Sequence, residues 1–134
     1  MLALMPTIMG AIAPAVAGDI ADCNQSTDPV RQIRGCSGFI DSGASGNNLA
    51  IAHANRGIAY DALGNTDRAI AEFDAALRVN PGYAVAYYNR GIAYSGLGDI
   101  VRAIADFDKA VALEASDPDA YNVRGIAHAE LRNF

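Results

Sequence analysis

The feature that most limits how this chain can fold is a sequence that repeats itself every 34 residues. Asn-Arg-Gly-Ile-Ala-Tyr occupies residues 55–60 and recurs at 89–94, and its central Arg-Gly-Ile-Ala occurs a third time at 124–127. The same interval relates Arg-Ala-Ile-Ala at 68–71 to the same residues at 102–105. A period of this length is typical of an array of supersecondary units that bury their apolar faces against one another. The sequence therefore predicts a stack of repeats.

Each repeat is predicted to be a pair of helices separated by a tight turn. Gly64 and Gly98 are expected to end the first helix of each pair, because glycine adopts the left-handed cap conformation at little cost. Asp117 and Pro118 suit the start of a further helix, with aspartate as the N-cap and proline in the first turn. The expected helices are 49–63, 66–79, 84–97, 101–113 and 118–131.

These residues resemble the tetratricopeptide repeat, a 34-residue helix-turn-helix unit, in the asparagine-arginine-glycine form that looks bacterial. The matching residues are Gly57, Gly91, Ala69, Ala103, Phe73, Phe107 and Pro81. Ala115 departs from the pattern, since Pro81 would predict a proline there, and residues 116–118 supply the break instead. The resemblance covers residues 49–134. It implies an all-α, right-handed solenoid of helical hairpins, with about two and a half repeats plus a degenerate N-terminal half-repeat.

The repeat domain is expected to follow two N-terminal segments. Residues 18–45 are predicted to form the degenerate half-repeat, which caps the stack, and a flexible loop is expected at 41–48. The repeats themselves divide into 49–81, 82–115 and a partial unit at 117–134.

Residues 1–17 are predicted to be a secretory signal peptide. They carry no charge and end in Ala15, Val16 and Ala17, the small-x-small pattern that signal peptidase accepts. The stretch is too short, and too broken by proline and glycine, for a stable membrane span. The alternative is an apolar N-terminus that remains part of the protein. A lipid anchor on Cys23 is disfavoured, because charged Asp22 precedes it. A signal peptide implies a periplasmic or secreted protein.

Cys23 and Cys36 are the only cysteines, and they lie thirteen residues apart in the half-repeat. In an exported chain an even pair of cysteines suggests one disulfide. Such a bond would hold together the weakest part of the stack. The alternative is two separate buried thiols.

In the tetratricopeptide family the first helix of each pair lines a concave groove that holds a peptide or a protein segment. Carried over by register, the resemblance implies a groove lined by Ile51, Ala54, Asn55, Ile58, Asp61, Val85, Tyr88, Asn89, Ile92, Ser95, Asn122 and Ile126. Some members clamp a C-terminal carboxylate with asparagine, lysine and arginine. Asn55 and Asn89 match the asparagine, but the single lysine, Lys109, lies on a second helix, so such a clamp is not expected.

Arg56, Arg90 and Arg124 recur at one position of the repeat and allow two interpretations. They could form a basic row that grips an acidic ligand, or each could pair with Asp74 or Asp108 inside the stack. The strict register favours pairing inside the stack. Tyr60 and Tyr94 are likewise expected in the core.

Several classes of function are disfavoured by composition. A net charge of −5 with ten lysine and arginine residues argues against nucleic-acid binding. There is no phosphate-binding loop, no nucleophile with a neighbouring base and no cofactor motif, so an enzyme is not expected. His53 and His128 lie far apart, without metal-ligand spacing. The expected function is an exported protein-binding scaffold. The alternative is a structural domain that forms homo-oligomers through its C-terminal end.

Overall fold

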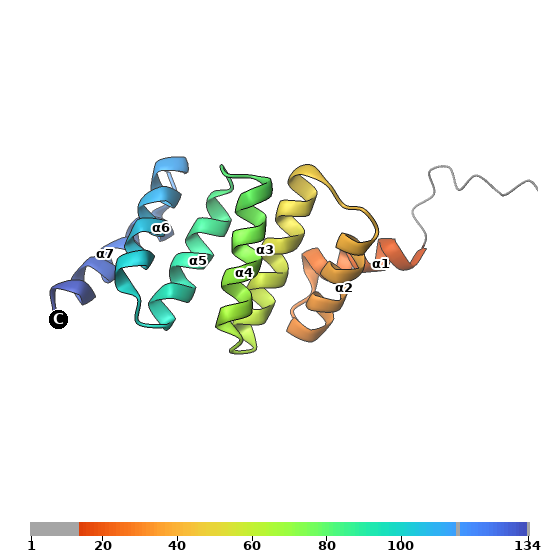
Figure 1. Ribbon diagram of the computed structural model, residues 1–134, viewed down its shortest axis with the longest axis horizontal. Coiled ribbons are helices and arrows are strands. Elements are labelled where there is room, and N and C mark those ends of the chain that lie inside the picture. Colours follow the sequence, from red (N-terminus) through yellow and green to blue (C-terminus); the bar gives the residue numbers. More distant parts are fainter. Residues whose placement is uncertain (1–13, 115, 134) are drawn as a thin grey trace, which may run out of the picture.

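Helices account for most of the chain. The computed structural model describes residues 14–114 and 116–133, and within these residues it contains helices and no strand. The helices are α1 (Pro14–Gln25), α2 (Pro29–Asp41), α3 (Gly46–Ala62), α4 (Thr66–Val79), α5 (Ala84–Gly96), α6 (Ile100–Leu113) and α7 (Pro118–Arg132). Figure 1 shows them side by side in chain order along the long axis of the molecule. The predicted all-α stack of helical hairpins is confirmed.

Each helix packs mainly on the helices next to it in sequence. The pairs α1–α2, α3–α4 and α5–α6 form the hairpins, and α2–α3, α4–α5 and α6–α7 join each hairpin to the next. The first helices also meet, since α1 contacts α3 and α3 contacts α5. One side of the stack is therefore built from first helices, which is the side that the sequence predicted for a groove.

The turns inside the repeats follow the glycine prediction. Gly64 and Gly98 have φ values of 78° and 80°, in the left-handed region. The N–H of Asn65 donates to the carbonyl of Tyr60 at 2.9 Å, and the equivalent bond recurs 34 residues later. Together with a longer bond from the N–H of Leu63 at 3.2 Å, this bond satisfies a carbonyl at the helix end. Asp117 caps α7, as predicted, by accepting from the N–H of Asp119 at 2.9 Å.

The N-terminal segment forms a hairpin of two helices, α1 and α2. Cys23 on α1 and Cys36 on α2 are joined by a disulfide, with their Cα atoms 4.4 Å apart. A Cβ atom added to Gly35 would lie 2.7 Å from the carbonyl oxygen of Asp19 and 2.8 Å from the nitrogen of Cys23. The two backbones therefore approach so closely that only glycine fits at this position.

Two boundaries differ from the sequence prediction. The loop expected at 41–48 is shorter, because α2 extends to Asp41 and α3 begins at Gly46. Polar, turn-forming residues can occupy the first turn of α3, because the first N–H groups of a helix have no intrahelical partner.

The predicted signal peptide falls largely outside the described residues. Its expected cleavage motif, residues 15–17, lies in the first turn of α1.

A phenyl ring packed on a glycine forms the centre of each complete repeat. Phe73 and Phe107 are 1% and 2% exposed. A Cβ atom added to Gly57 would lie 2.7 Å from Cε1 of Phe73, and one added to Gly91 would lie 2.6 Å from Cε1 of Phe107. At Gly125, the equivalent glycine of α7, an added Cβ would have no neighbour within 4 Å. Glycine is thus required by packing in the first two repeats only.

We expect opposite effects of alanine at equivalent glycines. Gly91→Ala should lower the free energy of unfolding by roughly 1–3 kcal/mol, because the methyl group overlaps the Phe107 ring. Gly125→Ala should raise it by about 0.5–1 kcal/mol, because alanine has the higher helix propensity and the space is open. Urea denaturation followed by circular dichroism measures both. Equal effects would show that the ring contact does not limit residue size.

Candidate functional site

Arg90 on α5 is held by carboxylates from both neighbouring second helices. Its Nε and Nη2 donate to Asp106 of α6, each at 2.8 Å, and its Nη1 donates to Asp74 of α4 at 2.7 Å. The guanidinium also lies over the rings of Tyr87 and Tyr94, with Cζ 5.6 and 5.9 Å from their centroids. The hydrogen bonds to Asp106 contribute most to a pKa of Arg90 above its usual value. Each of the three guanidinium nitrogens of Arg90 therefore donates a hydrogen bond inside the stack.

The same pairing recurs along the stack with a fixed spacing. Nη2 of Arg56 donates to Oε1 of Glu72 at 2.9 Å. Glu72 follows Arg56 by sixteen residues, and Asp106 follows Arg90 by the same interval. Nη1 of Arg124 lies 3.5 Å from Oδ1 of Asp108, sixteen residues behind, as Asp74 is behind Arg90. The arginines therefore pair within the protein and do not form a free basic row.

A second cluster around Glu72 was not foreseen from the sequence. Nδ1 of His53 lies 2.9 Å from Oε2 of Glu72, and Nη1 of Arg56 donates to Oγ of Ser37 at 3.0 Å. Burial raises the pKa of Glu72, but hydrogen bonds from His53 and Arg56, with the charge of Arg56, outweigh it and leave this pKa below its usual value. Because Ser37 is on α2, the cluster ties the N-terminal hairpin to the first repeat. From the sequence, His53 was weighed only as a metal ligand, so its contact with Glu72 was not predicted.

The arginine pairs should differ in their contribution to stability according to their burial. Arg90→Ala would leave Asp106, which is 6% exposed, without a partner and should lower the free energy of unfolding by roughly 2–4 kcal/mol. Arg124→Ala removes one longer, more exposed contact and should cost about 1 kcal/mol or less. Urea denaturation measures both. A larger loss for Arg124→Ala would contradict this ranking.

The groove residues predicted from the sequence fall on the first helices, and most of them are accessible. Ile51, Asn55, Ile58 and Asp61 on α3, Val85, Tyr88, Asn89, Ile92 and Ser95 on α5, and Asn122 and Ile126 on α7 are partly or well exposed. Ala54 is wrong as a groove residue, because it is 0% exposed and packs in the core beside Phe73. Its small side chain sits where α3 faces α4 and α5.

Two hollows lie along α5, one beside α6 and the turn that follows it, the other between α5 and α7. One, with a volume of about 50 Å³, is lined by Ala84, Val85, Tyr88, Ala110, Glu114 and Asp117. The other, with a volume of about 150 Å³, is lined by Ile92, Ser95, Phe107, Val123, Ile126, Ala127 and Glu130. Val85, Tyr88, Ile92 and Ser95 follow the helical period, so the hollows share one face of α5. We call these two hollows together the α5–α7 groove. Glu114, Val123 and Glu130 were not foreseen as lining residues.

The asparagines that match a carboxylate clamp are occupied within the protein. Nδ2 of Asn55 donates to Oδ1 of Asn24 on α1 at 3.1 Å, and Nδ2 of Asn89 donates to the carbonyl of Val85 at 2.8 Å. None of the lining residues of the α5–α7 groove is a lysine or an arginine.

The end of the α5–α7 groove near Tyr88 is electrically negative. Burial, followed by the charges of Asp119 and Asp117, raises the pKa of the Tyr88 hydroxyl. Burial and the charge of Glu114 raise the pKa of Tyr83 in the same way. Burial is the larger cause of both shifts, and the nearby carboxylates add to it because negative groups make it harder to form a phenolate.

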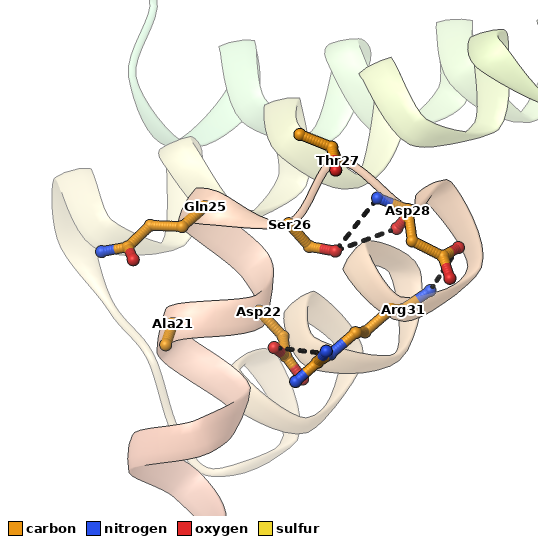
Figure 2. Close-up of a pocket in the computed structure, with 7 residues that line it drawn as sticks. All are labelled: Ala21, Asp22, Gln25, Ser26, Thr27, Asp28 and Arg31. Carbon is orange, nitrogen blue, oxygen red and sulfur yellow. Dashed lines mark hydrogen bonds and ion pairs between the residues drawn. The ribbon is translucent and has the colours of Figure 1, made fainter.

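A third hollow, of about 350 Å³, lies at the turn between α1 and α2 and is polar. Figure 2 shows its lining residues, Ala21, Asp22, Gln25, Ser26, Thr27, Asp28 and Arg31. Nε of Arg31 lies 2.9 Å from Oδ1 of Asp22, and Oδ1 of Asp28 accepts from the N–H groups of Val30 and Arg31. These contacts cap α2 and close the turn, so the hollow is accounted for by local structure.

Across residues 14–114 and 116–133, every helix is too short or too polar to cross a lipid bilayer. The same residues contain no group of three or more histidine, cysteine, aspartate or glutamate side chains placed to share a metal ion.

A 34-residue period, paired helices and a row of first helices along one side define a helical-repeat solenoid. The family model for the tetratricopeptide repeat matches residues 54–120 and 88–134, and the chain belongs to this family. No curated protein sequence matches this one significantly.

Solved structures share the fold. The first tetratricopeptide domain of Spaghetti (RPAP3), bound to the HSP90 peptide SRMEEVD, is similar with a TM-score of 0.77 and 21% identity, over 87% of this chain and 90% of that one. The corresponding domain of Sgt2 from Aspergillus fumigatus has a TM-score of 0.78 and 18% identity, over 90% and 81%. MamA has a TM-score of 0.68 and 26% identity, over 75% of this chain and only 54% of MamA.

Proposed function

We propose that this protein is a binding module that holds a peptide or a segment of another protein in the α5–α7 groove. The observation that carries the proposal is the exposure of Ile92 and Ile126, which are 37% and 52% exposed although both border a hollow. Burying their side chains against a ligand would contribute on the order of 1 kcal/mol each. The peptide held by the Spaghetti domain, which has the same fold, supports a peptide as ligand.

The proposed role is binding rather than catalysis. The serine of the groove, Ser95, has no histidine among the residues that line its hollow, so no base is placed to activate it. The remaining lining residues are largely apolar, which suits an apolar side chain of a partner.

Removing the exposed isoleucines should weaken binding without harming the fold. Peptides selected from a random library against the natural protein should bind the Ile92→Ala, Ile126→Ala double variant about tenfold more weakly, since two apolar contacts are lost. Fluorescence anisotropy measures the affinities. Val101→Ala is the matched control, because Val101 is 66% exposed on α6, outside the groove lining. An equal loss in the control would place the ligand elsewhere.

Self-association through α7 is a second candidate. Tyr121, Ile126 and Leu131 of α7 are all well exposed, and exposed apolar groups on one helix favour contact with a second molecule. Sedimentation of the same variants separates the two roles. A dimer that dissociates in the double variant would favour self-association, whereas a monomer that binds selected peptides favours the binding module.

We also propose that residues 1–17 direct export and that the mature protein is periplasmic or secreted. The disulfide between Cys23 and Cys36 supports this, because such bonds persist in oxidising compartments. The small-x-small motif before Gly18 supports it as well.

The exported protein should begin at about Gly18 and carry the disulfide. Its intact mass should therefore lack the leader and two hydrogen atoms. Mass spectrometry of protein recovered from the cell envelope or the medium, with and without reduction, measures both features. A retained leader, or two thiols that react with an alkylating reagent under non-reducing conditions, would contradict the proposal.

A further inference from the structure

The α5–α7 groove has an apolar middle and carboxylates at both ends. Ile92 and Ile126 lie in the middle, between the two hollows' outer ends. Glu114 and Asp117 line the hollow at one end, and Glu130 lines the hollow at the other. Glu114 and Glu130 are exposed, so both can meet a ligand from solvent.

Glu114 and Glu130 have no positive side chain as a partner within the described residues, and Asp117 accepts a hydrogen bond from the N–H of Asp119 as the cap of α7. None of the ion pairs there involves Glu114, Asp117 or Glu130. The nearby arginines are already neutralised, since Arg90 binds Asp74 and Asp106 and Arg124 faces Asp108. The pairing inside the stack therefore leaves the groove with negative charge only.

The nearby carboxylates affect a side chain of the groove itself. Tyr88 lines the first hollow, and after burial the charges of Asp119 and Asp117 are the causes that raise its pKa. A positive group entering at this end would be attracted, and a further negative group would be repelled.

We infer that the α5–α7 groove selects a peptide segment whose apolar side chains are flanked on both sides by lysine or arginine. The inference rests on the proposed function and adds the chemistry of the ligand. Val85 and Ser95 mark the two ends and lie about three helical turns, or roughly 15 Å, apart along α5. An extended segment rises about 3.3 Å per residue, so basic residues about four to five positions apart reach both ends.

The inference sets this protein apart from the similar structure that carries SRMEEVD. That peptide contains two glutamates and an aspartate. Here the same charges would meet Glu114, Asp117 and Glu130, and like charges placed together weaken binding.

Three synthetic peptides test the inference directly. All have capped termini and the same apolar centre of valine, leucine and isoleucine, and they differ only in two flanking residues, which are lysine, glutamine or glutamate. The full chain should bind the lysine peptide about tenfold more tightly than the glutamate peptide, with the glutamine peptide between them, as two exposed ion pairs allow. The difference should shrink as salt is raised from low to physiological concentration and beyond.

Charge-neutralising variants assign the preference to the groove. The Glu114→Gln, Glu130→Gln double variant should bind the three peptides with affinities within about twofold of one another. Asp41→Asn is the control, because Asp41 is an exposed carboxylate at the end of α2, outside the groove. It should keep the full preference for lysine.

The outcomes separate the inference from the function on which it rests. Equal binding of the lysine and glutamate peptides, with both weakened by Ile92→Ala and Ile126→Ala, would overturn the charge preference and leave the groove as the binding site. A lysine preference that survives Glu114→Gln and Glu130→Gln would also overturn it. If none of the three peptides bound at millimolar concentration, the inference would be wrong. The proposed function would fail only if the library peptides also bound the groove variants as tightly as they bind the natural protein.

Discussion

The contact between a phenyl ring and a glycine sets the geometry of the two complete repeats. Phe73 lies on Gly57, and Phe107 lies on Gly91, with no room for even one methyl group between them. This contact fixes how closely the two helices of a hairpin approach, and the alanines around it let the next hairpin approach as closely. Because the hairpin is the unit that repeats, its geometry determines the direction of every first helix and hence the groove that they line.

Ion pairs between neighbouring helices add to the packing of the aromatic side chains. Arg90 lies between two second helices, where carboxylates sixteen residues away on either side accept its hydrogen bonds, whereas Arg56 and Arg124 each pair with one such carboxylate. Because Arg90 and Asp106 are largely buried together, the charge of Arg90 is neutralised inside the stack. The α5–α7 groove is consequently lined by apolar side chains and by acids without an arginine partner. Neither the net charge nor the composition of the chain predicts this combination.

The N-terminal hairpin shows a different route to the same packing. It has no phenylalanine on a glycine at its centre, and instead a disulfide joins Cys23 to Cys36 while Gly35 lets the backbones touch. The polar cluster of Ser37, Arg56 and Glu72 then attaches this hairpin to the first repeat. The sequence pointed to the cysteine pair, but the cluster depends on side chains from three helices and has no local sequence signal.

The sequence alone determined the period, the helices and their turns, since a 34-residue repeat with glycine caps leaves one arrangement of hairpins. By resemblance and register it also predicted which residues of the first helices line a groove, and most of these are accessible. It misplaced Ala54, whose burial depends on how α3 meets α4 and α5. Only the tertiary structure decided which acids find an arginine and which, like Glu114 and Glu130, remain at the groove. Charge pairing depends on the distances between side chains on neighbouring helices, and a repeat pattern does not contain those distances.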